Sequence, residues 1–218
     1  YKDISGPDGV PDGVIDDYDK TNIGSPMPKF TFGWTNTFRY KNFDLSVFIN
    51  GSYGNKVYNY LSMKLTHMNS PWTNQLNAVN GRAQLVPINP NKVYEDGTMW
   101  YNDVSNVMVA NPGASIPRAT INDPNDNDRI SDRYIEDGSY IRLKNISLGY
   151  TFPKKTIDKL GLSNLRIYAN IQNLLTITGY DGYDPEIGAS TSSVNVYGLD
   201  NGRYPSPTVY SFGLNVSF

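Results

Sequence analysis

The sequence predicts an all-β protein made of strands from a large antiparallel transmembrane β-barrel with long extracellular loops. Three observations lead to this fold class. The final segment alternates between large apolar and small polar residues, other segments repeat that pattern, and the chain has 17 tyrosines. Because strand side chains point alternately to opposite faces, the alternation gives one apolar and one polar face. Tyrosine rings suit the interfacial girdles of a barrel.

The final segment is the clearest strand. In a soluble sandwich, an apolar strand face points into a core. An apolar face that closes on phenylalanine is instead typical of outer-membrane barrels. The predicted membrane-insertion signal consists of Tyr210, Phe212, Leu214, Val216 and Phe218.

Composition fits a barrel and excludes several other classes of protein. Hydrophobic residues make up only 39% of the chain, but barrel strands need about 9 to 11 residues and half of these face water. The absence of cysteine excludes thiol catalysis and Cys-ligated zinc. A single histidine, His67, excludes a His cluster. A net charge of −2 gives no basic stripe for nucleic acid.

A β-hairpin is predicted near the start of the chain. Residues 30–40 place phenylalanine, tryptophan and tyrosine on one face, and residues 43–50 alternate in the same way. Lys41 and Asn42 form the tight turn between them.

Two more strands are predicted, at about 140–152 and 165–173. The alternation of apolar and polar residues is interrupted at the start of the first of these strands, because Arg142 and Lys144 fall on the same face as Ile146. Either that end of the strand rises above the hydrocarbon, or a bulge resets the register.

Loop lengths predict the orientation, since bacterial barrels have short periplasmic turns and long extracellular loops. The links at 41–42 and 153–164 are short, whereas those at 51–139 and 176–207 are long. The predicted organisation is an acidic extracellular loop that is a candidate calcium site (1–29), a barrel hairpin (30–51), a long extracellular loop (52–139), a second hairpin (140–174), an extracellular loop (175–207) and a terminal strand (208–218).

Five strands cannot close a barrel, which needs at least about eight. Open sheet edges cannot face lipid, because unpaired backbone groups there are costly. We therefore expect the chain to belong to a larger polypeptide or to assemble with other chains. A short helix is expected at 73–84, inside the long loop.

The chain resembles the C-terminal part of the SusC/RagA family of TonB-linked outer-membrane transporters from Bacteroidetes. The stretches that carry the resemblance begin at residues 8, 43, 131, 165 and 209. The most specific are EDGSYIRLKNISLGY and NLLTITGYDGYDPE. The resemblance implies a barrel of roughly 22 strands with an N-terminal plug, a SusD-like surface lipoprotein as partner, contact with TonB through the N-terminal part, and import of glycan oligosaccharides or peptides. It implies no enzymatic activity.

An Asp-rich segment at the start of the chain resembles the calcium loop of an EF-hand. Oxygen ligands recur at positions 1, 5, 9 and 12 of a window, with Gly13 at position 6 for the turn. The pattern departs from an EF-hand at position 3, which is Val10, and at position 12, which is Asp instead of Glu. The alternative is an acidic surface loop whose residues make turns. The predicted Ca²⁺ ligands are Asp8, Asp12, Asp16 and Asp19.

The remaining polar candidates carry weaker signals. A lone histidine such as His67 is usually a surface residue, and nothing places a nucleophile beside it. No catalytic residue is predicted. A second acidic group lacks ligand spacing and is expected to be a solvated loop; it consists of Asp123, Asp126, Asp128 and Asp132.

Aromatic residues in the long loops are candidate ligand-binding residues, because their rings can stack on sugar faces. Trp72, Trp100 and Tyr101 are the candidates in the first long loop. The alternative is that they pack the loops together or line the interface with a SusD-like partner. The corresponding residues of the last outer loop are Tyr180, Tyr183, Tyr197 and Tyr204.

The leading functional hypothesis is part of a TonB-dependent nutrient importer in the outer membrane of a Gram-negative bacterium. The alternative is a secreted, calcium-stabilised β-sandwich that binds carbohydrate. A glycan hydrolase ranks third, because no pair of carboxylates has support beyond acidity. The first two differ physically: a sandwich buries its aromatic faces against each other, whereas a barrel exposes them to lipid.

Overall fold

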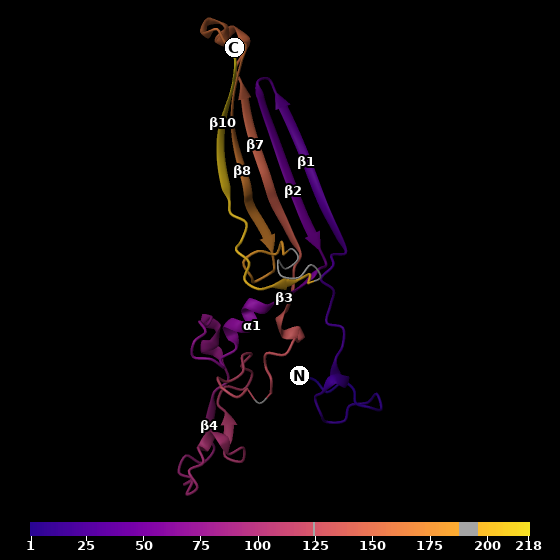
Figure 1. Ribbon diagram of the computed structural model, residues 1–218, viewed down its shortest axis with the longest axis vertical. Helices are drawn as coiled ribbons and strands as arrows, with labels where there is room; N and C mark the ends of the chain where they lie inside the picture. Colours follow the sequence, from indigo (N-terminus) through magenta and orange to yellow (C-terminus); the bar gives the residue numbers. More distant parts are fainter. Residues whose placement is uncertain (124, 188–195) are drawn as a thin grey trace. The chain divides into compact units, whose positions relative to one another are not determined.

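The computed structural model describes residues 1–123, 125–187 and 196–218 (Figure 1). The chain divides into two units. The sheet unit comprises Tyr1–Asn59 and Ile135–Phe218, and the insert unit comprises Tyr60–Tyr134.

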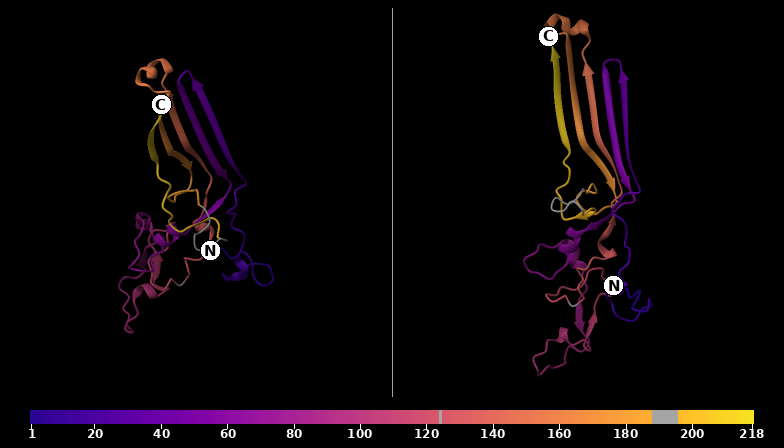
Figure 2. Two further views of the ribbon diagram at one scale, coloured as in Figure 1. Left: turned by 45° about the horizontal axis from the view of Figure 1, so that its top comes forward. Right: turned by 45° about the vertical axis from the view of Figure 1, so that its right-hand side comes forward.

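The sheet unit is built around five long antiparallel strands in the order β1-β2-β7-β8-β10. Figure 2 shows them as one curved sheet. Each of these strands pairs with the next long strand along the chain, as in an up-and-down barrel wall. Long segments separate β2 from β7 and β8 from β10. The strands are β1 (Phe30–Tyr40), β2 (Phe43–Tyr53), β7 (Tyr140–Thr151), β8 (Asn164–Thr178) and β10 (Val209–Ser217).

The antiparallel strands confirm the predicted all-β class, and the sheet on its own is open. β8 is longer than predicted and continues past Asn173 to Thr178. Asn173 adopts a positive φ of 52°, a conformation that asparagine tolerates better than most residues. The pairing of β8 with β7 shifts register at this point, between Gln172 and Leu175.

A small three-stranded sheet is formed by segments from the long loops. β3 (Lys56–Asn59) pairs with β6 (Ile135–Asp137) on one side and with β9 (Leu199–Asp200) on the other. Val57 at its centre is only 1% exposed. This sheet gives the sheet unit a compact core where the long loops leave the strands.

The link between β7 and β8 contains α2 (Lys154–Ile157) and the 3₁₀ turn η5 (Asp158–Leu160). Ile157 is buried and anchors this short segment. Gly161 ends it with a φ of 72°, the left-handed conformation in which helices commonly terminate on glycine. Residues before β1 contain one more 3₁₀ turn, η1 (Asp17–Asp19).

The bulge predicted in the third segment is present. Phe48 pairs with Asn145 whereas Ile49 pairs with Leu143, so Lys144 is the extra residue. Beyond the bulge, Arg142 lies opposite Asn50, on the polar face. The bulge therefore keeps Ile146 on the apolar face while it moves Arg142 to the other.

The insert unit has little regular structure. It contains α1 (Tyr60–Thr66) and a two-stranded sheet of β4 (Leu85–Pro87) and β5 (Val107–Val109). The helix expected at 73–84 is wrong: only the 3₁₀ turn η2 (Asn77–Gly81) forms there, in a polar stretch without an apolar stripe of helical period. The other 3₁₀ turns are η3 (Trp100–Asn102) and η4 (Asp132–Tyr134).

Few apolar side chains are buried in the insert unit; those described are Met63, Ile116 and Tyr134. Its core is therefore small for a segment of this length. Within the described ranges, no helix has the length and apolar character needed to cross a bilayer.

Candidate functional site

The apolar face of the five-stranded sheet is uncovered. Trp34 on β1 is 54% exposed and Phe212 on β10 is 83% exposed, although both lie in regular strands. Leu148 and Ile167 on the central strands are also exposed. Among the described residues of the sheet unit, no second layer packs on this face. An interior of the kind found in a β-sandwich is thus not present here.

Adjacent strands build this face from matched side chains. Leu148 pairs with Ala169, which pairs with Phe212. A shallow groove lined mainly by apolar side chains crosses the sheet at this level, with Phe43 and Leu214 among its walls. This part of the sheet therefore exposes a continuous apolar surface.

Aromatic pairs mark the two ends of the apolar face. Phe30 and Tyr53 lie 5.4 Å apart at the end where the long loops leave. At the other end, Phe43 lies 4.7 Å from Tyr150, which contacts Phe152. Between the two ends β2 spans 11 residues, or about 25 Å of height at a tilt near 40°. That height matches the apolar band of membrane barrels.

The opposite face of the sheet is polar and closely fitted. Tyr168 pairs with Gly149 on one side and with Gly213 on the other, and its ring covers the space where a side chain at Gly213 would lie. Arg166 Nη2 donates to Asp44 Oδ2 at 2.6 Å. These contacts give a wall with polar groups on the side away from the apolar face.

A buried ionic cluster fastens the loop between β8 and β10, which the sequence predicts to be the last outer loop, to the ends of β7 and β8. We call it the loop node. Arg142 is 2% exposed and donates to Asp184 Oδ1 at 2.5 Å and to Glu186 Oε2 at 2.7 Å. Lys144, the bulge residue, also donates to Glu186, at 2.8 Å. Thr176 on β8 accepts a third hydrogen bond from Arg142.

The loop node extends into the small sheet. Tyr180 donates its hydroxyl to Asp200 at 2.5 Å, and both side chains are buried. Burial and this hydrogen bond raise the pKa of Tyr180 well above its usual value. Burial alone would raise the pKa of Asp184, but hydrogen bonds from the Ser206 backbone N–H and from Arg142 outweigh it and lower that pKa.

Sequence reasoning missed the loop node, because its partners are far apart in the chain. Arg142 and Asp184 are separated by 42 positions. The only signal in the sequence was that each lies in one of the two stretches most specific to the resemblance: Arg142 in 136–150 and Asp184 in 173–186. The phase break at Arg142 marked the position without identifying its partner.

The four predicted calcium ligands lie in one loop, and three of them hold backbone turns. Asp19 accepts hydrogen bonds from the N–H groups of Ile4, Ser5 and Asp16, and the first of these is the main cause that lowers its pKa. Asp12 accepts a hydrogen bond from the Val14 N–H, and Asp16 accepts one from the Tyr18 N–H.

Within the part of the chain that the structure describes, no group of three or more histidine, aspartate or glutamate side chains is placed to hold a metal ion. Metal binding by Asp8, Asp12, Asp16 and Asp19 therefore stays a prediction. The structure adds one residue that the spacing did not indicate. Asp3 accepts a hydrogen bond from the Gly13 N–H, while its Oδ1 atom is buried with no partner among the described residues.

His67 and Asp123 differ from their sequence-based expectations. Neither is a solvated surface residue: the two side chains form a pair at 2.8 Å and are 12% and 10% exposed. Burial would raise the pKa of Asp123, but hydrogen bonds from Asn127 and His67 lower it overall. A small cavity beside the pair is lined by Arg118 and Tyr134. The pair stabilises the sparse interior of the insert unit, which single residues in a sequence do not reveal.

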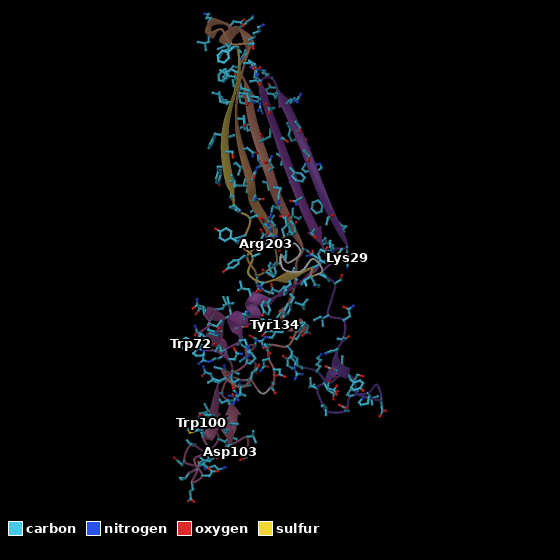
Figure 3. All side chains as sticks on the ribbon, viewed as in Figure 1. Lys29, Trp72, Trp100, Asp103, Tyr134 and Arg203 are labelled. Atoms are coloured by element: carbon cyan, nitrogen blue, oxygen red, sulfur yellow. The ribbon has the colours of Figure 1, made fainter. Side chains whose placement is uncertain are left out.

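The candidate aromatic residues are not brought into one site. Trp72 is 92% exposed, and Trp100 packs edge-to-face against Tyr101 at 5.7 Å. Figure 3 shows Trp72 and Trp100 at separate places in the insert unit. In the sheet unit Tyr180 is buried in the loop node, whereas Tyr183, Tyr197 and Tyr204 are exposed.

Comparison with known proteins agrees with this geometry, although no family model matches the chain. Over 211 residues the chain is 36% identical to TonB-dependent receptor P3 of Formosa agariphila, a match that covers 94% of this chain and 18% of the receptor. It is 29% identical over 209 residues to TonB-dependent receptor SusC of Bacteroides thetaiotaomicron, covering 94% of this chain and 17% of SusC. Nearly the whole chain therefore matches a segment of TonB-dependent receptors of the SusC/RagA family.

A solved structure shares the fold. The RagAB peptide importer in the closed-closed state contains a chain that matches this one with a TM-score of 0.66 and 21% identity, covering 98% of this chain and 20% of that one. The chain thus spans about a fifth of the length of the SusC/RagA-type proteins it matches. Receptors of this family reside in the outer membrane of Gram-negative bacteria.

Proposed function

We propose that the chain supplies five adjacent wall strands to the β-barrel of an outer-membrane TonB-dependent importer. The observation that carries the proposal is the uncovered apolar face, bounded by aromatic pairs at both ends. Lipid is the solvent that such a face requires. The protein acts by binding and translocation, without enzymatic chemistry.

The rest of the same polypeptide is the first partner that the proposal requires. β1 and β10 each pair with a neighbour on one side only among the described strands, so their outer edges need strands from the rest of the barrel. A plug then lies against the polar face that carries Arg166 and Asp44. TonB engages the importer through the N-terminal part of the protein.

A SusD-like surface lipoprotein is the second partner in this proposal. The insert unit supports it, because a segment with a small core exposes Trp72, Val93, Val104 and Ile121. Exposed large apolar side chains in a poorly packed segment favour contact with another protein. Transported substrates are glycan oligosaccharides or peptides, and one structural relative is described as a peptide importer. Trp72, Trp100 and Tyr101 are proposed to contact the substrate or the lipoprotein.

Membrane extraction tests the barrel assignment. The full-length protein that contains this chain should stay in the membrane pellet after washing with alkaline carbonate, and detergent should release it. Release by carbonate alone would overturn the assignment and favour the secreted carbohydrate-binding sandwich.

The Asp-rich loop is a separate proposal for a Ca²⁺ site. The unpartnered, buried Oδ1 atom of Asp3 supports it, because an isolated buried carboxylate oxygen is costly unless a cation or donor meets it. Titration of the purified full-length protein with Ca²⁺, followed by calorimetry, should give saturable binding. Asp12→Asn with Asp16→Asn should weaken it. An unchanged heat for this variant, or no heat for the unmodified protein, would remove the site.

A further inference from the structure

Four lysines gather at the end of the sheet where the links between strands are short. We call them the basic cluster: Lys41 in the β1–β2 turn, and Lys154, Lys155 and Lys159 in the link between β7 and β8. All four are exposed. Among the residues that the structure describes, no acidic side chain forms an ion pair with any of them.

Backbone contacts hold these links at one end of the sheet. The Thr151 N–H donates to the Asn42 carbonyl at 2.9 Å, which joins the two short links. The Ser163 N–H donates to the Ser217 carbonyl at 2.8 Å, which brings the end of β10 to the same place. Side chains on the two links therefore face one common environment.

Apolar and aromatic side chains accompany the cluster. Leu160 is 69% exposed, directly after Lys159, and Phe218 is 92% exposed. The Lys41 ammonium lies 5.3 Å from the centre of the Tyr40 ring. Exposed lysines mixed with exposed aromatic and aliphatic side chains are typical of segments that lie at a lipid headgroup layer.

The opposite end of the sheet has a different charge. There the acidic side chains of the loop node and of the 1–29 segment predominate, and the basic groups of the node are neutralised by Asp184 and Glu186. At the short-link end the only exposed acid within the α2–η5 segment is Asp158. The sheet unit is therefore polarised along its strands, with unneutralised positive charge at one end.

We propose that the basic cluster binds the phosphate groups of anionic phospholipids in the leaflet that adjoins the short links. The inference rests on the proposed barrel function, which places this leaflet on the periplasmic side. Lysine ammonium groups attract anionic headgroups, and each lysine near such a surface raises affinity about fivefold. Leu160 and Phe218 enter the apolar region beneath those headgroups and fix the height of the barrel wall.

Lipid-selective binding to the full-length protein tests the proposal. Native mass spectrometry measures the affinity of the detergent-solubilised protein for phosphatidylglycerol and for phosphatidylethanolamine. We expect a preference for phosphatidylglycerol. The triple variant Lys154→Gln, Lys155→Gln, Lys159→Gln should lose at least about tenfold of that affinity. The corresponding Lys→Arg variant, which keeps the charge, should bind like the unmodified protein.

A matched control places the same three charge changes at the other end: Lys2→Gln, Lys20→Gln and Lys29→Gln should leave phosphatidylglycerol affinity unchanged. Equal affinity of the unmodified protein for both lipids, or an unaffected cluster variant, would overturn the proposal. These outcomes are distinct from failure of the barrel function, because in that case the protein would not be recovered from the membrane fraction at all.

Discussion

The sheet unit and the insert unit are stabilised in different ways. In the sheet unit, long backbone ladders pair β2, β7 and β8 on both sides and β1 and β10 on one side, while many apolar side chains remain exposed. In the insert unit, short elements surround a few buried residues, among which the His67–Asp123 pair is prominent. The comparison indicates that order in the first unit comes mainly from hydrogen-bonded strands, and in the second from isolated polar contacts around a small core.

The largest effect should come from the loop node. Replacement of Arg142 by Met leaves Asp184 buried without its cation, which should cost about 3 to 5 kcal/mol locally. Limited proteolysis of the full-length protein in detergent should then cut the last outer loop. Lys144→Met, which removes a half-buried partner of Glu186, should be much milder. Equal protease resistance of the Arg142 variant and the parent would show that the node does not hold the loop.

A lipid-facing charge ranks next. Leu214→Arg, on the apolar face of β10, should cost about 2 to 4 kcal/mol and impair insertion, while Asn215→Arg on the polar face should be milder. The amount of folded protein in the outer-membrane fraction measures both. Similar assembly of the two variants would contradict the assignment of the faces.

In the insert unit, His67→Leu should cost about 1 to 3 kcal/mol, because Asp123 loses a partner while it stays largely buried. Hydrogen exchange should show faster opening of segment 60–134 with no change in the five long strands. Asn127→Ala removes the other side-chain donor to the same carboxylate, although the Asn127 backbone N–H still donates to it, and should act on the same segment. Faster exchange in the strands as well would mean that the two units do not unfold separately.

Acid should have the smallest effect, and it should act on the loop node. The folded-state pKa of Asp184 is lowered, so its stabilisation is present above the unfolded pKa of about 3.9 and is lost as pH falls through the folded value. Protease cutting of the last outer loop should therefore increase only below about pH 4. Loop release near neutral pH would contradict this assignment.

Local patterns predicted the strands well because each depends on a period of two. The alternation at 209–218 and the phase break beside Lys144 both follow from that period, and the bulge resolved the break in one of the two ways expected. The full length of β8 was not predicted. The strand continues past an irregularity at Asn173, whose positive φ cannot be recognised from the apolar pattern.

Contacts across the chain could not be predicted in this way. His67 and Asp123 are 56 positions apart, and Arg142 and Asp184 are 42 apart. Burial of such groups depends on how the loops fold back, and polar residues in loops look alike in a sequence. The candidate aromatic residues failed to converge for the same reason, since stacking potential does not determine location.

The extra residue in β7 changes which residues of the strand lie on the apolar face and which lie on the polar face. Between Lys144 and the short links, the even-numbered residues Ile146 and Leu148 lie on the apolar face. On the other side of Lys144, the odd-numbered residues Ile141 and Leu143 lie on that face. This exchange of odd for even places the Arg142 guanidinium on the polar face, and it is accompanied by a register shift in the pairing of β7 with both β2 and β8. A strand at the rim of a barrel can thus direct a charged side chain toward the loops while its outer face stays apolar.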